Sequence, residues 1–294
     1  MLGKGWVTID WGTTNRRIFV LGPDGQVLSR HADARGVTAI APGGFPAEIA
    51  ELRARFGDRP FLLAGMIGSN RGWMEAPYVP CPVTLPLLAE RLAWAEPGGT
   101  AIVPGACVDR GDAAEVMRGE EVQLLGAAAA GLVPPDAALC LPGTHAKWAM
   151  LEQSVLTGFR TVMTGELFAL LRNHSILSGS LKGEVRPDAA FREGVRRSLE
   201  DCTLSADLFG ARARMLLGKL AETDAPSYVS GLLIGADLRI GLGVVGDGTV
   251  ALIGDPALTR LYGAALEEAG RTCAEIDGEQ AFLAGIRAIA EKLS

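Results

Sequence analysis

The first thirty residues alternate short apolar runs with turn-forming residues. The runs 6–9 and 17–21 have the length of β-strands. Residues 10–16 between them contain a glycine and several polar side chains, which indicates a tight turn. Pro23-Asp24-Gly25 predicts a second turn, and a third strand is expected to begin at residues 26–28. The chain is therefore predicted to open with a β-meander.

The next hundred residues combine helical patterns with one long loop. Residues 46–56 predict a helix, and residues 60–64 predict a buried strand. Residues 65–82 are rich in glycine, proline and aromatic side chains, so we expect a long loop of the kind that often binds ligands in compact enzymes. Residues 120–130, dense in alanine and leucine, predict a helix that ends near Gly131.

The opening pattern recurs near the middle of the chain. Residues 138–141 and 148–151 predict two strands joined by a turn at 142–145. Each of the two turns carries a glycine–threonine pair, followed after two residues by a cation, Arg16 in the first and Lys147 in the second. The interval between the pairs is close to half of the 294 residues. We therefore expect two units of similar plan, residues 1–131 and 132–294.

The remaining third of the chain is predicted to be mainly helical. A strand is expected at 249–253, and helices are expected at 191–220, 228–239, 258–269 and 279–293. Strands and helices are mixed along the whole chain, so the fold class is α/β. Whether the last helix packs on the first unit stays open.

Composition and charge exclude several classes of protein. Hydrophobic residues make up 48% of the chain and charged residues 21%, which is typical of a folded globular protein. A net charge of -6 argues against nucleic acid as a partner. The longest apolar run, 124–133, is too short to span a bilayer, so no membrane partner is expected. The scattered cysteines favour free thiols and a cytoplasmic location; they are Cys81, Cys107, Cys140, Cys202 and Cys273.

The first turn has the residues of an anion-binding site. A glycine at position 12 lets the backbone approach a bulky anion and tolerates a positive φ. Successive N–H groups, with the hydroxyls of Thr13 and Thr14 and the amide of Asn15 beside them, would form an anion nest. Asp10, at the end of the first strand, suits Mg²⁺ held through water. The alternative is a plain hairpin with a solvated aspartate.

The second turn offers a similar nest with a cation beside it. Gly143 and Thr144 would supply its N–H groups, and Lys147 its charge. Alternatively, Lys147 extends along an ordinary hairpin and His145 has only polar neighbours. Two facing nests would bind a triphosphate from both sides, and this pairing favours the first interpretation.

Two adjacent glutamates open the helix at 120–130. A carboxylate at a helix N-terminus is stabilised by the helix dipole and stays ionised. Glu120 and Glu121 therefore suit a general base that accepts the proton of an attacking hydroxyl. On composition alone, ordinary capping of the helix by these side chains is the stronger interpretation.

Seven segments of the chain together resemble the 2-dehydro-3-deoxygalactonokinases. They are DWGTTN (10–15), GMIGS (65–69), WMEAPY (73–78), MRGEE (117–121), LPGTHAKW (141–148), MTGEL (163–167) and SGLLIG (230–235). The resemblance implies the ribonuclease-H-like, two-lobed fold of actin-like ATPases and sugar kinases, with the nucleotide in the cleft between the lobes. It also implies transfer of the γ-phosphoryl group of ATP, with Mg²⁺, to the 6-hydroxyl of 2-dehydro-3-deoxy-D-galactonate.

The resemblance also assigns roles to particular residues. Residues 10–15 match the first phosphate motif, and Gly143-Thr144 matches the second. The segment 230–235, with Gly231 and Gly235, matches an adenosine-binding segment. Related sugar kinases begin the corresponding helix with a catalytic aspartate after a glycine or asparagine, and here the pair is Gly119-Glu120. Glu120 is thus the first candidate for the base, with Glu121 and His145 as alternatives.

A sugar-acid substrate needs a cation for its carboxylate and donors for its keto and hydroxyl groups. A guanidinium suits the carboxylate because it donates two parallel hydrogen bonds. The candidates for substrate contact are Arg16 or Arg17, of which at most one faces the cleft, together with Ser69, Arg71, Trp73 and Tyr78. Trp73 and Tyr78 could equally pack in the core of the loop.

Other functions stay open at the level of the sequence. A kinase of the same fold could act on another sugar or sugar acid, such as 2-dehydro-3-deoxygluconate, or on pantothenate. An ATP-binding sensor without catalysis is a third interpretation. The oligomeric state is also open, a homodimer included.

Overall fold

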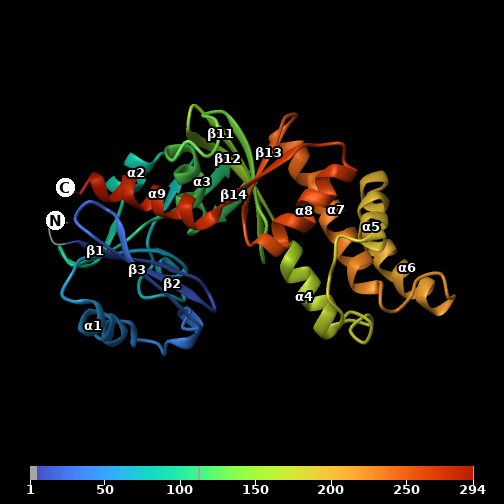
Figure 1. Ribbon diagram of the computed structural model, residues 1–294, viewed down its shortest axis with the longest axis horizontal. Helices are drawn as coiled ribbons and strands as arrows, with labels where there is room; N and C mark the ends of the chain where they lie inside the picture. Colours follow the sequence, from blue (N-terminus) through green and yellow to red (C-terminus); the bar gives the residue numbers. More distant parts are fainter. Residues whose placement is uncertain (1–4, 112, 294) are drawn as a thin grey trace. The chain divides into compact units, whose positions relative to one another are not determined.

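The chain is divided into two compact units. The computed structural model describes residues 5–111 and 113–293 (Figure 1). The first unit contains residues up to 135, together with 152–158 and the C-terminal stretch from 279. The second unit contains 136–151 and 159–278. The first change of unit comes at 135/136, four residues after the predicted boundary.

The first unit is built on a six-stranded sheet with the order β3-β2-β1-β4-β7-β6. β1 pairs antiparallel with β2 and parallel with β4, and β4 pairs parallel with β7. The meander predicted for the first thirty residues is confirmed as β1, β2 and β3. The strand bounds are β1 (Trp6–Trp11), β2 (Arg16–Leu21), β3 (Val27–Asp33), β4 (Phe61–Gly65), β6 (Ala93–Glu96) and β7 (Thr100–Ile102).

Helices α1 (Phe45–Phe56), α3 (Glu120–Ala129) and α9 (Gly278–Glu291) belong to this unit. Phe45, Ile49 and Leu52 of α1 pack in one core cluster with β1, β2 and β4. α3 and α9 approach closely through glycines. A Cβ on Gly126 would lie 2.0 Å from the Ala281 oxygen. α9 also packs on the sheet, since the rings of Phe19 and Phe282 are 6.0 Å apart.

A smaller three-stranded sheet, β5-β8-β9, completes the first unit. Its strands are β5 (Tyr78–Pro80), β8 (Gly105–Arg110) and β9 (Ala113–Met117). Helix α2 (Leu85–Glu90) and the 3-10 turns η1 (Val37–Ala39) and η2 (Met66–Gly68) also belong to this unit. The sequence analysis did not predict these elements, and β5 lies inside the predicted loop 65–82. A strand of three residues has too little periodicity to be recognised without its partner.

The second unit repeats the strand order of the first. Its sheet runs β12-β11-β10-β13-β14, which corresponds position by position to β3-β2-β1-β4-β7. β10 and β11 are antiparallel, and β10, β13 and β14 are parallel, as in the first sheet. The strand bounds are β10 (Ala137–Leu141), β11 (Ala146–Glu152), β12 (Val155–Val162), β13 (Val250–Gly254) and β14 (Cys273–Asp277). The similar plan predicted from the two glycine–threonine turns is thus present in the topology.

Helices α4 to α8 accompany this second sheet (Figure 1). Their bounds are α4 (Thr164–His174), α5 (Ala189–Glu200), α6 (Leu204–Leu216), α7 (Ala225–Val245) and α8 (Pro256–Glu268). The segment 191–220, predicted to be largely helical, contains two helices, since α5 ends at Glu200 and α6 begins at Leu204. α7 is long and apolar enough to cross a membrane by length and composition, but 72% of its most apolar window is buried, as in a core helix.

Candidate active site

The turn between β1 and β2 presents its N–H groups to solvent. Its carbonyl groups are occupied, because Val37 donates to the oxygen of Gly12, Thr38 to that of Thr13 and Gly36 to that of Thr14. The backbone N–H groups of Thr13 and Thr14 bond no group in the described part of the chain, and both residues are exposed. This is the donor arrangement of an anion nest.

The reason for a glycine at position 12 differs from the predicted positive φ. It does not adopt a positive φ. Its N–H closes the turn by donating to the Asn15 oxygen at 2.9 Å. A Cβ there would lie 3.1 Å from the same oxygen. A side chain at position 12 would be crowded against this oxygen, so the close backbone approach favours glycine.

Asp10 and Arg17 are partners across β1 and β2. Both Nε and Nη2 of Arg17 donate to Oδ2 of Asp10, at 3.2 and 2.5 Å. Oδ1 of Asp10 accepts no hydrogen bond from any described residue and is thus available to a cation. Asp10 lies near the carboxyl end of β1, beside the turn.

Arg16, a predicted substrate contact, is a structural residue. Only 4% of it is exposed, and it forms ion pairs with Asp33 on β3 and Glu48 on α1. Its guanidinium also lies over the Trp11 ring, 4.9 Å from the centroid. The guanidinium is already paired with the carboxylates of Asp33 and Glu48, so a carboxylate ligand would have to displace one of them. Arg17 is the more exposed of the two arginines.

Two glycines bring the start of α3 against the carboxyl end of β4. Gly65 ends β4 with φ 94°, and a Cβ there would lie 2.8 Å from the Trp11 oxygen. Gly119 precedes α3 with φ 110°, and its Cβ would lie 3.1 Å from the Cα of Gly65. Only glycine adopts these conformations without strain. β1 and β4 are parallel, so the start of α3 lies at the same sheet edge as Asp10.

The two glutamates at the start of α3 have different environments. Glu121 is fully buried, and both its carboxyl oxygens accept from the Gly119 N–H at 2.8 Å. Burial raises the pKa of the Glu121 carboxyl to about 8, and the charge of Glu120 adds to the rise, although the Gly119 hydrogen bonds oppose it. Glu120 is partly exposed, and its Oε2 accepts from the Arg118 N–H at 3.0 Å. Glu121 thus caps the helix, and Glu120 is the glutamate that a substrate can reach.

The raised pKa of Glu121 predicts a pH-dependent stability. Because the folded-state pKa lies above the ordinary value of 4.5, the contribution of Glu121 is complete below that pH and is lost as the pH rises to about 8. Glu121→Gln cannot ionise, so we expect its free energy of unfolding to gain on the wild type by up to about 1.4 kcal/mol per pH unit in this window. Urea unfolding at several pH values measures the difference. Parallel stability curves for the two proteins would contradict the assignment.

The loop 65–82 contains the other predicted substrate contacts. The Ser69 hydroxyl is buried, donates to the Met66 oxygen at 2.7 Å and accepts from the Arg71 N–H. The Arg71 side chain is exposed, so it is accessible to a ligand. Trp73 packs against the core of the first unit, as the alternative interpretation expected. Tyr78 is 38% exposed, and its ring stacks with Arg118.

Arg118 links this loop to the start of α3, and the sequence analysis did not single it out. Its guanidinium lies 4.2 Å from the centroid of the Tyr78 ring, and Nη2 donates to the Ala76 oxygen at 2.7 Å. Its own N–H donates to Glu120. Arg118 lies within the MRGEE segment (117–121), and this is the signal by which the sequence could have indicated a role for it.

The turn between β10 and β11 has the same open donors as the first turn. The N–H groups of Gly143 and Thr144 bond no described group, and Thr144 is exposed. Lys147, predicted to contact phosphate, is only 3% exposed, and its Nζ donates to the His145 oxygen at 3.1 Å. It therefore supports the turn from the interior.

A cavity of about 150 Å³ adjoins this turn in the second unit. It is mainly apolar, with a few polar groups from the turn and from α4, α7 and α8, a combination common in small-molecule sites. Its walls include Gly143, Gly165, Ser230, Ile234, Leu258 and Leu261.

Gly231 and Gly235 of the predicted adenosine segment face away from this cavity. A Cβ on Gly231 would lie 2.1 Å from the Phe191 oxygen, and one on Gly235 would lie 2.7 Å from the Val195 oxygen. Both oxygens belong to α5. The two glycines therefore allow α5 and α7 to pack closely, and Ser230 and Ile234 of the same segment line the cavity instead.

Asp237, which the sequence analysis missed, joins the elements around this cavity. Its buried carboxylate accepts from Trp148 at 2.7 Å, from Thr164 at 2.6 Å and from the hydroxyl of Tyr262. Burial raises the pKa of Asp237, and these three hydrogen bonds oppose the rise. β11, α4, α7 and α8 thus share one fully hydrogen-bonded carboxylate.

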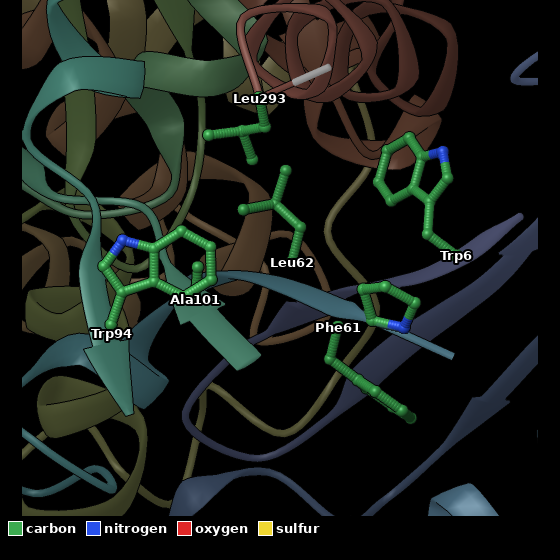
Figure 2. A pocket seen from close by; sticks show the side chains of 7 residues that line it. Trp6, Phe61, Leu62, Trp94, Ala101 and Leu293 are labelled. Atoms are coloured by element: carbon green, nitrogen blue, oxygen red, sulfur yellow. The ribbon is translucent and has the colours of Figure 1, made fainter. Parts of the chain in front are cut away.

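A second, much smaller recess lies at one end of the first sheet. Figure 2 shows the side chains of Trp6, Leu62, Trp94 and Leu293 around it. Its volume of about 10 Å³ is at the lower limit for one water molecule. Its lining is apolar and contains none of the predicted site residues, so it is a packing defect.

Two units with one strand order, each opening with strand, glycine–threonine turn and strand, define the class of actin-like ATPases and sugar kinases. The activator of 2-hydroxyisocaproyl-CoA dehydratase from Clostridium difficile, solved with bound ADPNP, has a similar fold. Its TM-score is 0.50 at 13% identity, with 98% of this chain and 96% of that chain covered.

Closer relatives place the chain within this class. The 2-keto-3-deoxy-galactonokinase family matches residues 10–289. The 2-dehydro-3-deoxygalactonokinase of Escherichia coli (strain K12) is 36% identical over 292 residues, covering 98% of both chains. A solved protein from Sinorhizobium meliloti, provisionally named a 2-dehydro-3-deoxygalactonokinase, has a TM-score of 0.90 at 37% identity, covering 98% of this chain and 99% of its own.

The chain belongs to the 2-keto-3-deoxy-galactonokinase family. The resemblance inferred from the seven segments is confirmed, and with it the expectation of a sugar-acid kinase that uses ATP. The family match covers all seven segments, including both glycine–threonine turns and the Gly119-Glu120 pair.

Proposed function

We propose that the protein transfers the γ-phosphoryl group of ATP to the 6-hydroxyl of 2-dehydro-3-deoxy-D-galactonate. The observation that carries the proposal is the family match over residues 10–289. Both turns have N–H groups open to an anion, which supports a reaction on phosphate groups. We also infer a cytoplasmic location, in keeping with the five free cysteines.

Each of the two turns is a proposed binding site for phosphate groups of ATP. Thr13 and Thr14 with Asn15 form the first donor group, and Gly143 with Thr144 forms the second. The adenosine would occupy the cavity lined by Ser230 and Ile234. These assignments leave Gly12 and Lys147 out of the predicted phosphate contacts, because the Gly12 N–H is bonded within the turn and Lys147 is buried. They also replace Gly231 and Gly235 with their neighbours on the cavity wall.

Asp10 fits the requirements of a magnesium site. Mg²⁺ keeps several of its waters and is usually bound through one or two carboxylates together with substrate phosphates. Oδ1 of Asp10 has no described partner, and the carboxylate lies beside the first phosphate turn. When bound, Mg²⁺ would offset negative charge on the β- and γ-phosphates.

Glu120 is the proposed base that orients the acceptor hydroxyl and takes its proton. It lies at the sheet edge that holds Asp10, and it is partly exposed. In-line phosphoryl transfer depends mainly on positioning and electrostatic stabilisation. Arg17, Arg71 and Tyr78, which are at least partly exposed, are the proposed contacts of the sugar acid, and Ser69 helps to shape the loop.

A comparison of epimeric substrates tests the proposed function. We expect kcat/KM with Mg-ATP to be at least about tenfold higher for 2-dehydro-3-deoxy-D-galactonate than for 2-dehydro-3-deoxygluconate, because one misplaced hydroxyl leaves polar groups of the site unpaired. Coupled detection of ADP measures both rates, and omission of the acceptor controls for ATP hydrolysis. Faster turnover of the gluconate would reassign the substrate. ATP binding without transfer to either acid would favour a sensor.

A further inference from the structure

The second glycine–threonine turn contains His145, which contacts Glu166 and has no role in the proposed function. Nε2 of His145 lies 2.5 Å from Oε2 of Glu166, which belongs to the first turn of α4. His145 directly follows Gly143-Thr144, and 47% of its side chain is exposed. Its other ring nitrogen, Nδ1, makes no hydrogen bond to any residue in the described part of the chain.

Glu166 holds this turn by its backbone as well as by its side chain. Its N–H donates to the Thr144 oxygen at 3.0 Å. The preceding Gly165 packs so closely that a Cβ on it would lie 2.5 Å from the Gly143 oxygen. The start of α4 thus contacts the turn through the backbone and side chain of Glu166 and through Gly165.

Of the two side chains in this turn that can carry a positive charge, His145 is exposed and Lys147 is buried. Lys147 is buried behind the turn and donates to the His145 oxygen. Glu166 contacts the ring from α4, and the buried Asp237 is bonded to Thr164, two residues before Glu166. When the imidazole is protonated, the exposed face of the turn carries a positive charge, which Glu166 partly balances. Lys147 contacts the backbone oxygen of His145 in this turn.

We propose that His145, held by Glu166, binds a phosphate group of the nucleotide through Nδ1, in addition to the backbone N–H groups of the turn. This inference rests on the proposed nucleotide site. With Nε2–H donated to Glu166, a neutral ring has a lone pair at Nδ1 and repels a phosphate oxygen. The imidazolium donates from both nitrogens. The nucleotide therefore binds the imidazolium form of His145.

Calorimetric titration with ATP, in the absence of the sugar acid, tests this binding role. We expect His145→Gln to bind ATP about tenfold more weakly than the wild type at the same pH, because a charge-assisted hydrogen bond is lost. The His145 side chain is about half exposed, and circular dichroism verifies the fold of the variant.

Two further variants distinguish a binding role from a general disturbance. Glu166→Gln keeps the side-chain shape but removes the charge that holds the imidazolium, so it should also bind ATP more weakly than the wild type. His174→Gln alters a histidine in the last turn of the same helix, and we expect its affinity for ATP to equal that of the wild type.

Each outcome decides between distinct conclusions. Equal ATP affinity in the wild type and His145→Gln would overturn the role of His145 and leave the proposed function intact. A loss of affinity in His174→Gln as large as that in His145→Gln would overturn the role as well. Failure of the folded wild type to bind ATP at any pH would remove the proposed function and this inference together.

Discussion

Glu120→Gln should lower kcat for phosphoryl transfer at least about 100-fold while ATP binding stays nearly unchanged. Glutamine has the shape of glutamate and still accepts from the Arg118 N–H, but it cannot take a proton from the acceptor hydroxyl. Because Glu120 is partly exposed, its substitution should leave the fold intact. Single-turnover rates with saturating substrate, together with calorimetric ATP affinities, separate chemistry from binding.

Two control variants make this result specific. Glu51→Gln alters an exposed glutamate on α1 in the same unit, and its kcat should equal that of the wild type. Glu121→Gln tests the other glutamate at the start of α3, which caps the Gly119 N–H from a buried position. Near-normal turnover in Glu120→Gln, with loss of turnover in Glu121→Gln, would move the base to Glu121.

Asp10→Ala should abolish magnesium-dependent activity, with a loss of at least about 1000-fold in kcat/KM. A cation that stabilises the transferring phosphoryl group contributes several kcal/mol, and each 1.36 kcal/mol is a factor of about ten in rate. The substitution leaves Arg17 without its partner, but that pair is partly exposed, so the cost in stability is small. Initial rates over a series of Mg²⁺ concentrations measure the effect.

The controls for Asp10 separate the metal role from the ion pair. Asp10→Asn keeps the side-chain volume and should lose activity nearly as completely, because the charge that binds the cation is removed. Asp24→Ala alters an exposed aspartate in the turn before β3 and should behave as the wild type. Substantial magnesium-dependent activity in Asp10→Ala would exclude the proposed metal contact.

The strands and turns nearest the chemistry were predictable because their signals are local. An apolar run, a glycine-bearing turn and a second apolar run form a hairpin almost independently of the rest of the chain. This is true of β1 with β2 and of β10 with β11, and it explains why Asp10, Gly12 and Gly143 were found. The three-residue β5 was missed because its strand character depends on pairing with β8.

Burial decided which predicted contacts keep an exposed side chain. Arg16 and Lys147 occupy equivalent places after the two turns, and each is an attractive phosphate or carboxylate ligand by residue type. In the fold, Arg16 is surrounded by Asp33 and Glu48, and Lys147 is directed at the backbone of its own turn. Whether a cation faces solvent or the interior depends on elements distant in sequence, so no local pattern contains the answer.

The amino-acid sequence by itself determined the family, the α/β class, the two hairpins and the acidic start of α3, since all of these depend on short-range patterns or on motif order. Only the tertiary structure distinguished Glu120 from Glu121, assigned Gly231 and Gly235 to helix packing and paired His145 with Glu166. These distinctions depend on burial and on contacts between separate elements. Such contacts exist only when the chain has folded.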